Sequence, residues 1–239
     1  MDRLSEAKAL IKETEKDKIV VFSGAGISIA SGIPPFRGKD GLWSKYDPTV
    51  FDIDFFLTQP AKSWHYIKEI FYSYLLKDVK PNAAHYAVAK LGCPVITQNI
   101  DGLHQAAGSK EVVEFHGTAE TLVCVDCKKR YNRKEVNLNV EIPRCRCGGI
   151  LKPDFVFFKE PIPQHAFDRS IELAENCKVM IVVGTTGEIM PASRIPYLAK
   201  RHGAKIIEVN VAASNFTYEI TDIFLKGKAE EILPLLVEE

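Results

Sequence analysis

Short apolar segments alternate with helical segments along most of this 239-residue chain, and this alternation limits the possible folds more than any other feature. The apolar segments are rich in β-branched residues and show no apolar-polar alternation. Such runs are typical of parallel strands that are buried on both faces of a sheet. The pattern therefore predicts an α/β fold with a Rossmann-like, doubly wound parallel sheet. The expected strands are 19–22, 94–97, 112–115, 155–158, 179–183, 205–209 and 223–225.

Segments whose apolar residues recur at helical spacing lie between these strands. The expected helices are 3–15, 61–76, 80–91, 103–107, 164–177, 192–202 and 229–237. The helix at 61–76 carries a stripe that includes Trp64, Ile67, Ile70 and Phe71. We interpret this stripe as core packing rather than as a ligand site.

The first expected strand runs directly into Gly24-Ala25-Gly26. Glycines that follow a buried strand let the backbone approach a phosphate closely, usually at a helix N-terminus. However, the strict dinucleotide fingerprint requires Gly or Ala three residues after the second glycine, where this chain has Ile29. A tight structural turn also accounts for both glycines, so this segment alone leaves the two interpretations open.

The ends of the other expected strands carry small or polar residues as well. They are Gln98-Asn99-Ile100-Asp101, His116, Gly184-Thr185-Thr186 and Asn210. Because ligands of an open parallel sheet bind beyond the carboxyl ends of its strands, this shared placement predicts a nucleotide site. His116 is the candidate general base, although a lone histidine after a strand is often a satisfied core or surface residue. We assign no chemistry to the other five histidines.

The alternation of strands and helices stops between residues 118 and 152, where charged, turn-forming and cysteine residues dominate. Cys124 with Cys127, and Cys145 with Cys147, form two close pairs. Two thiolate pairs on turns suit one tetrahedral structural zinc ion, and a redox dithiol is the main alternative. A zinc ribbon can also bind nucleic acid, but we interpret the small basic cluster 128–130 as a solvated face.

Charge and hydropathy exclude two classes of partner. Lys and Arg together number 31, as do Asp and Glu, so no overall field attracts nucleic acid, and we expect no direct nucleic-acid binding. No apolar run approaches the roughly 20 residues that span a bilayer, and we expect no membrane partner. The N-terminal segment lacks the apolar core of a signal peptide. We therefore predict a cytoplasmic protein.

Taken in chain order, these motifs resemble the sirtuins, the NAD-dependent protein deacylases, over nearly the whole chain. The resemblance rests on GAGIS, SGIP and FRG within 24–38, QNID at 98–101, His116-Gly117, the four cysteines, KP.FVFF.EP at 152–161, Gly184-Thr185 and Val209-Asn210. It implies a protein-lysine deacylase, expected to be a deacetylase, that transfers the acyl group from lysine to ADP-ribose and releases nicotinamide. The alternatives are a mono-ADP-ribosyltransferase and a catalytically weak NAD-binding sensor.

The resemblance also implies roles for individual residues. His116 and Asn99 are expected to be catalytic, and Val156 and Phe158 to line the site of an acyl-lysine protein or peptide, whose backbone adds as a strand. NAD, the co-substrate, is expected to contact Gly24, Ala25, Gly26, Phe36, Arg37, Gln98, Asn99, Ile100, Asp101, His116, Gly184, Thr185, Thr186, Asn210, Lys228 and Ala229. One structural zinc is expected on Cys124, Cys127, Cys145 and Cys147.

The resemblance implies a Rossmann-like NAD-binding domain with an inserted small zinc-binding domain. The expected NAD-binding domain comprises 1–37, 83–117 and 153–239. The small domain would then combine a cofactor loop and helical module, 38–82, with a zinc-binding module, 118–152.

At several positions the sequence departs from the pattern of the family. Lys159 stands where a glycine is usual, and Gly187-Glu188 replace residues that are commonly apolar, both in the expected peptide groove. Ile67 and Ile70 stand where members that remove succinyl groups have Tyr and Arg. The last difference favours an apolar acyl group, from acetyl to longer chains, over an acidic one.

Overall fold

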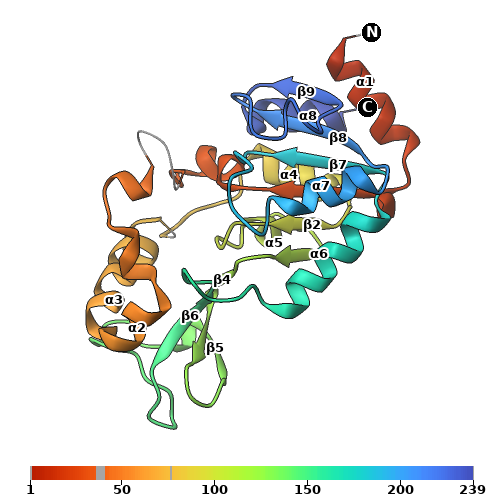
Figure 1. Ribbon diagram of the computed structural model, residues 1–239. Helices are drawn as coiled ribbons and strands as arrows, with labels where there is room; N and C mark the ends of the chain where they lie inside the picture. Colours follow the sequence, from red (N-terminus) through yellow and green to blue (C-terminus); the bar gives the residue numbers. More distant parts are fainter. Residues whose placement is uncertain (1, 36–40, 76, 239) are drawn as a thin grey trace.

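A computed structural model describes residues 2–35, 41–75 and 77–238, and its main element is a six-stranded parallel sheet (Figure 1). The strand order is β3-β2-β1-β7-β8-β9. The strands are β1 Ile19–Ser23, β2 Val95–Thr97, β3 Val112–Glu114, β7 Val179–Val183, β8 Lys205–Asn210 and β9 Ile223–Lys226. This architecture confirms the predicted Rossmann-like α/β fold.

Helices cover both faces of the parallel sheet (Figure 1). One face packs against α1 Arg3–Glu13, α4 Ala83–Leu91 and α8 Ala229–Val237, and the other against α6 Gln164–Asn176 and α7 Arg194–Arg201. Successive side chains of a strand point to opposite faces, so Val21 lies in the first core and Phe22 in the second. Every residue of β1 and β7 is buried, which explains their continuous apolar sequences.

A second part of the chain contains a three-stranded antiparallel sheet with the order β5-β4-β6 (Figure 1). Its strands are β4 Gly117–Cys124, β5 Arg130–Asn132 and β6 Leu151–Phe155. The helices α2 Ile53–Thr58 and α3 Pro60–Ile67 pack against it, and their shared core is rich in aromatic residues. The short helix α5 Leu103–Ala106 follows β2.

Two expectations about secondary structure were wrong. The strand expected at 155–158 is β6, which lies earlier and pairs with β4 rather than joining the parallel sheet. The helix expected at 61–76 is α-helical only to Ile67, because the segment Lys68–Leu75 continues as a π-helix. Trp64, Ile67, Ile70 and Phe71 are nevertheless buried, so the expected core stripe is confirmed.

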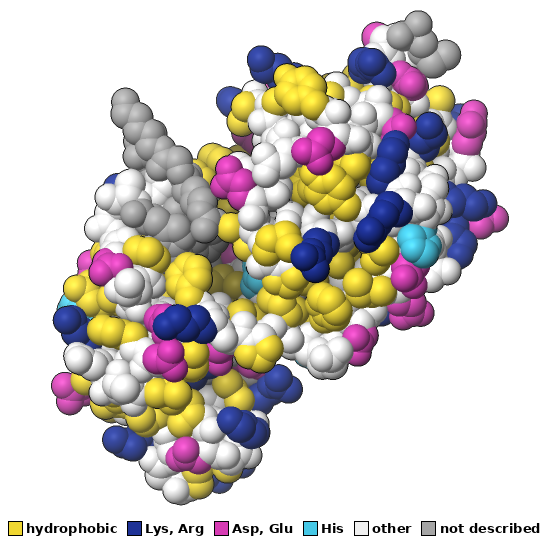
Figure 2. All heavy atoms as spheres, in the orientation of Figure 1, with side chains coloured by type: hydrophobic (Ala, Val, Ile, Leu, Met, Phe, Trp, Pro, Cys, Tyr) yellow, Lys and Arg dark blue, Asp and Glu magenta, His cyan; other side chains and the backbone are white. Residues whose placement is uncertain are grey.

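The boundaries expected from the sequence cross the small sheet. The expected boundary between 152 and 153 falls inside β6, and the one between 117 and 118 falls after the first residue of β4. Figure 2 shows that this face of the molecule is hollowed where its two parts meet, and that hydrophobic side chains gather along the hollow. Among the described residues, no helix combines the length and the apolar character needed to cross a membrane.

Candidate active site

The carboxyl ends of β1, β2, β7 and β8 bring the residues predicted to bind a nucleotide into contact. Gln98 Nε2 donates to Thr185 Oγ1 at 3.2 Å, which connects the ends of β2 and β7. Asn210 Nδ2 donates to Thr185 O at 2.9 Å and connects β8 to the same turn. Asn99 Nδ2 donates to Gly24 O at 3.2 Å. Side chains from distant parts of the sequence therefore meet at one edge of the sheet, as expected.

The glycines after β1 allow the turn at 24–26 to pack against the turn after β7. A Cβ atom on Gly26 would lie 2.5 Å from Gly184 Cα, and one on Gly24 would lie 2.8 Å from Gly184 O. The Gly26 N–H donates to Gly184 O at 2.8 Å. The close approach of two loops thus accounts for both glycines, in agreement with the structural alternative. The same approach places both turns within reach of one ligand.

His116 lies two residues after the end of β3 and is held by the residue that follows β2. Its Nδ1 lies 3.0 Å from Gln98 O. A carbonyl oxygen can only accept a hydrogen bond, so Nδ1 carries the proton and Nε2 keeps its lone pair. Burial lowers the pKa of His116, while the bond to Gln98 opposes this shift. The imidazole is therefore neutral near pH 7 and can accept a proton at Nε2.

A buried polar cluster lies beside the turn at 24–26. Ser28 Oγ donates to Asp101 Oδ2 at 2.7 Å and accepts from Asn99 Nδ2 at 3.2 Å. The Leu103 N–H donates to Asp101 Oδ1 at 3.0 Å, which ties the carboxylate to the start of α5. Burial raises the pKa of Asp101, and these hydrogen bonds oppose the rise. The cluster holds Asn99 and Asp101 in one orientation.

Two buried histidines, His85 and His104, belong to this polar cluster, although the sequence assigned them no chemistry. The Asn82 N–H donates to His85 Nδ1 at 3.3 Å, so the proton of His85 is on Nε2, which lies 3.4 Å from Ser28 Oγ. Burial lowers the pKa of His85 to about 4 and that of His104 to about 3. Both rings are therefore neutral near pH 7.

His104 connects the cluster to the last residues of two strands. Its Nε2 lies 2.9 Å from Ser23 Oγ, and Ser23 donates to Thr97 Oγ1 at 2.9 Å. Hydroxyls at the ends of otherwise apolar strands are the signal in the sequence that could have indicated these contacts of His104. For His85 the signal is the spacing of Asn82 and His85 at a helix start, where the two residues form a capping box.

The segment after β6 connects the candidate base to the second part of the chain. The Val156 N–H donates to His116 O at 2.8 Å, and the Phe158 N–H donates to Phe51 O at 2.9 Å. Phe157 is buried between these two residues, whereas Phe158 is 43% exposed. Because successive side chains of an extended segment point in opposite directions, Val156 and Phe158 lie on the other side of the segment from Phe157.

An ion pair packs against the inner side of this segment, where Phe157 is buried. Lys152 Nζ donates to Glu160 Oε2 at 2.9 Å, and it also donates to Pro153 O at 2.9 Å and Phe155 O at 2.7 Å. Glu160 Oε2 accepts the Phe157 N–H at 2.8 Å as well. The ammonium group of Lys152 lies 4.2 Å from the centre of the Phe157 ring. These contacts use all three ammonium hydrogens and keep Phe157 turned inward.

Lys159, which departs from the family pattern, has a left-handed backbone with φ of 70°. This conformation explains why a glycine is usual at the position. The Lys159 ammonium contacts Asp52 at 2.7 Å and Asp54 at 3.3 Å, so the side chain turns toward the start of α2.

The other residues predicted to contact the cofactor differ in their exposure to solvent. Lys228 is exposed and pairs with Glu231, whereas Ala229 is buried in the core at the start of α8. Ile100 is half-buried and packs against the aromatic core. Thr186 is exposed in the turn after β7. Phe36 and Arg37 lie outside the described residues.

The four predicted zinc ligands converge in the second part of the chain. Their sulfur atoms lie within 4.8 Å of one another, with Cys124 and Cys147 3.5 Å apart and Cys127 and Cys145 3.6 Å apart. Tetrahedral zinc with bonds of about 2.3 Å to sulfur requires separations of about 3.8 Å. A backbone hydrogen bond from Cys147, with a further one from the Tyr131 hydroxyl, lowers the pKa of Cys145 to about 6. The site is suited to one structural zinc ion.

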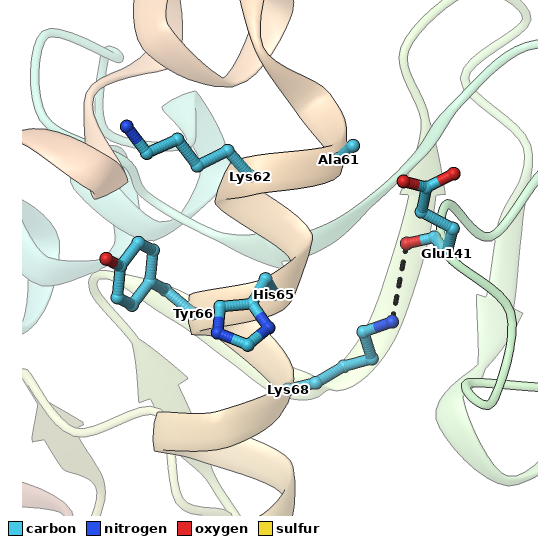
Figure 3. A pocket seen from close by; sticks show the side chains of 6 residues that line it. All are labelled: Ala61, Lys62, His65, Tyr66, Lys68 and Glu141. Carbon is cyan, nitrogen blue, oxygen red and sulfur yellow. Dashed lines mark hydrogen bonds between the residues drawn. The ribbon is translucent and has the colours of Figure 1, made fainter.

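A surface cavity of about 420 Å³ lies between α3 and residue 141 (Figure 3). It is lined by Ala61, Lys62, His65, Tyr66, Lys68 and Glu141. Lys68 Nζ is bound to Val140 O at 2.8 Å and to Glu141 O at 3.3 Å. Among the described residues, none of those predicted to form the active site lines this cavity.

Comparison with known proteins connects the site to one family. A model of the Sir2 family matches residues 24–191. An NAD-dependent protein deacetylase 1 from Pyrobaculum aerophilum is 43% identical, with 99% of this chain and 94% of the relative covered. An NAD-dependent protein deacylase 2 from Archaeoglobus fulgidus is 44% identical, with 100% and 96% covered.

Solved structures agree with these relatives. A Sir2 variant in complex with a deacetylated p53 peptide and 3′-O-acetyl ADP ribose has a TM-score of 0.89 at 37% identity, and 98% of this chain and 96% of that chain are covered. A Sir2 homologue in complex with ADP ribose has a TM-score of 0.91 at 35% identity, with 99% and 95% covered.

Proposed function

This chain belongs to the Sir2 family and is an NAD-dependent protein deacylase, and we propose that it removes acetyl and other apolar acyl groups from lysine side chains at the carboxyl edge of its parallel sheet. The proposal assigns the role of general base to His116. The observation that carries this assignment is the contact of His116 Nδ1 with Gln98 O at 3.0 Å, because it leaves Nε2 able to accept a proton.

The residues around His116 fit the two halves of NAD. Asn99 and Asp101, with Ile100, would hold the nicotinamide and its ribose, because Ser28 and Leu103 already fix their polar groups. The turn Gly184-Thr185-Thr186 and Asn210 would hold the adenosine half, with the start of α8 alongside. Bound NAD supplies the ribose carbon that releases nicotinamide and receives the acyl oxygen. His116 Nε2 would take the proton of the ribose hydroxyl.

The segment after β6 would receive the acylated lysine. Val156 and Phe158 lie on one side of it, while Phe157 and the ion pair of Lys152 with Glu160 hold the other side in the core. The substrate backbone would add as a strand, so that main-chain hydrogen bonds hold the peptide and side-chain pockets select it. Relatives solved with p53 peptides support an acyl-lysine peptide as the partner.

An apolar acyl group is favoured by the helix that follows Gln59. Ile67 and Ile70, which replace the Tyr and Arg of members that remove succinyl groups, have no exposed surface. Neither can bind a second carboxylate, so we expect acetyl and longer apolar chains to be preferred over succinyl.

We also propose a division of the chain into two domains, a lid and a cellular location. Residues 1–37, 83–117 and 153–239 would form the NAD-binding domain, and 38–82 with 118–152 the small domain. The lid role of Phe36 and Arg37 rests on the resemblance alone. A cytoplasmic location is supported by four clustered cysteines that suit a metal rather than disulfides.

The direct test is incubation with NAD and an acetyl-lysine peptide, with nicotinamide and O-acetyl-ADP-ribose measured by mass spectrometry. We expect both products in equal amounts. Absence of turnover with acetyl, butyryl and longer acyl peptides would overturn the proposal, and labelling of protein by ADP-ribose without deacylation would favour the transferase alternative.

The role of His116 is tested with His116→Ala. We expect kcat to fall by about 10²- to 10⁴-fold, the usual contribution of a general base, while NAD binding persists. His202→Ala is the matched control, because its side chain is 44% exposed and belongs to no part of the site. An active His116→Ala enzyme would remove this histidine from the mechanism.

A further inference from the structure

Glu208 is a carboxylate without exposed surface in the middle of β8, and no step of the proposed reaction uses it. A buried carboxylate requires hydrogen-bond donors, because transfer of a charge from water is costly. Three hydroxyl groups from one short segment supply them. Ser214 Oγ donates to Oε1 at 2.6 Å, and Thr217 Oγ1 and Thr221 Oγ1 each donate to Oε2 at 2.8 Å.

The same hydroxyl groups organise the backbone of residues 211–222, which form neither a helix nor a strand. The Ser214 N–H donates to Thr217 Oγ1 at 2.8 Å, and the Phe216 N–H donates to Ser214 Oγ at 3.1 Å. The Ser214 and Thr217 hydroxyls thus each donate to Glu208 and accept a backbone N–H, whereas the Thr221 hydroxyl lies 2.8 Å from Glu208 Oε2 and 3.1 Å from Phe216 O, the two acceptors to which it can donate. The carboxylate is the common acceptor around which this segment is folded.

This segment in turn supports the turn after β7. The Asn215 N–H donates to Thr186 O at 3.0 Å, and Asn215 Nδ2 donates to Gly187 O at 3.3 Å. The buried ring of Phe216 lies against Gly187, where a Cβ atom would be only 2.8 Å from the ring. Gly187 also has a φ of 75°, in the left-handed region that favours glycine. The ring of Phe216 and this φ together explain why the chain has glycine here.

We propose that Glu208 is a positioning residue for the adenosine half of NAD. Its carboxylate holds Ser214, Thr217 and Thr221, and the segment built on them holds the turn 184–187 against which NAD binds. This inference rests on the proposed function, because that proposal places the adenosine half at Thr185, Thr186 and Asn210. Glu208 itself has no exposed surface and acts through the loop rather than on the cofactor.

The position of Glu208 in the strand makes the coupling direct. Asn210 lies two residues further along β8, on the same side of the strand, and donates to Thr185 O at 2.9 Å. The turn 184–187 is therefore held by Asn210 at one residue and by Asn215 and Phe216 at the next two. Displacement of the 211–222 segment would leave only the first of these supports.

The test is Glu208→Gln, which keeps the shape of the side chain but replaces one acceptor oxygen with an NH2 donor. At least one of the three hydroxyl groups then loses its acceptor, and the loop loses its fixed geometry. We expect KM for NAD to rise about tenfold, while kcat at saturating NAD and KM for the acetyl-lysine peptide stay within about twofold. A residue that contributes only to overall stability would lower Tm without raising KM for NAD more than the other two constants.

Calorimetric binding of ADP-ribose gives a second readout that needs no deacylation. We expect its affinity to fall about tenfold in Glu208→Gln and in Thr217→Val, with a less than additive effect in the double variant, because both changes release the same loop. Ser170→Ala is the control, since this buried hydroxyl donates to Ala166 O of its own helix and, within the described part of the chain, has no hydrogen bond with the turn 184–187 or with residues 211–222. If Glu208→Gln does not fold, Ser214→Ala carries the same test.

The outcomes separate this inference from the proposed function. Wild-type protein that binds ADP-ribose but deacylates nothing would overturn the proposed function, and the binding data would still decide the role of Glu208. ADP-ribose affinity and KM for NAD within twofold of the wild type in Glu208→Gln, or in Ser214→Ala where that variant replaces it, would overturn the role of Glu208.

Discussion

The two sheets of this protein are stabilised in different ways. Every residue of β1 and β7 in the parallel sheet is buried, and its two cores consist mainly of aliphatic side chains. In the antiparallel sheet β4 is only partly buried and β5 is mostly exposed. Three short strands with so little buried surface need further support, here an aromatic core, a buried ion pair and a four-cysteine metal site.

The difference shows where single polar interactions matter. Trp64 Nε1 donates to Leu151 O at 2.8 Å, and the Tyr72 hydroxyl donates to Ala119 O at 3.1 Å, so even the aromatic core of the small sheet is held by directed bonds. Aliphatic burial on both faces contributes most of the stability of the parallel sheet, and its buried side-chain bonds are confined to the strand ends and to Glu208. We therefore expect the small sheet to be the more sensitive to loss of one group.

Loss of zinc is expected to have the largest effect, because it should act on the small sheet alone. Zinc binding to a four-cysteine site contributes on the order of 10 kcal/mol, so Cys145→Ser or chelation should disorder the small sheet and leave the parallel sheet folded. In a Trp43→Phe background, emission of the buried Trp64 should shift to longer wavelength while most far-UV ellipticity remains. Elemental analysis should find about one zinc per chain in the wild type. A metal-free protein with unchanged Trp64 emission would contradict the prediction.

Loss of one partner of the buried ion pair is expected to have the next largest effect. Lys152→Met leaves the Glu160 carboxylate, whose side chain is 23% exposed, without its cation, and should lower the free energy of unfolding by about 3 kcal/mol. Urea unfolding measures this. Lys152→Met with Glu160→Gln should recover most of the loss.

A pair in the parallel part provides the matched control. Lys200 and Asp222 lie 2.6 Å apart, with side chains 33% and 21% exposed. Because Lys200 is more exposed than Lys152 and Asp222 keeps Lys205 at 3.3 Å as a second cation, Lys200→Met should cost only about 1 kcal/mol. Equal losses in the two regions would remove the distinction drawn between them.

Low pH should lower the free energy of unfolding through the buried histidines of the polar cluster, His85 and His104. The pKa of His85 is about 4 in the fold, below its ordinary value of 6.5, so the unfolded chain binds more protons between these pH values and stability falls as pH falls. This histidine should account for about 2 kcal/mol of the loss between pH 7 and pH 5. The pKa of His104 is also lowered, so it adds to the loss of stability at low pH. Burial raises the pKa of Asp101, so this carboxyl group opposes the loss.

The measurement is the slope of unfolding free energy against pH in the wild type and in His85→Gln. The metal site is the same in both proteins, so release of zinc by acid does not affect the difference between the slopes. We expect a shallower slope in the variant. Parallel slopes would show that His85 is protonated in the folded state at the same pH as in the unfolded chain.

The smallest effect is expected from Lys159→Gly, in the segment that follows β6 of the small sheet. Glycine removes the cost of a left-handed backbone, about 1 kcal/mol. It also removes the exposed contacts with Asp52 and Asp54, and it increases the conformational entropy of the unfolded chain. These terms nearly cancel, so stability should change by less than about 1 kcal/mol in urea unfolding. A change above 2 kcal/mol would show that the ion pairs matter more than their exposure suggests.

Much of the fold could be predicted because its signals are local. The strands at 19–23 and 179–183 and the helix at 229–237 follow from runs and periods within a few residues of one another. The segment 155–158 was assigned to the wrong sheet because an apolar run does not specify its partner strand. That β6 pairs with β4 depends on contacts between residues far apart in sequence.

The candidate site was predictable only in part for the same reason. Residues after the strands were found because parallel strands place their carboxyl ends together, and four cysteines were found by their spacing. His85 and His104 were missed, since helical spacing does not tell which buried ring will meet Ser28 or Ser23. Glu208 was missed because its three hydroxyl partners follow it in a segment without periodicity.

The fold class, the edge of the sheet where the candidate site residues gather, the family and the zinc ligands follow from the sequence alone, because each depends on short-range pattern or on motif order. The need for glycine at 24 and 26, the free nitrogen of His116 and the pairing of the buried charges become visible only in the folded chain. These properties depend on the approach of distant segments to within a hydrogen-bond length, which no local pattern encodes.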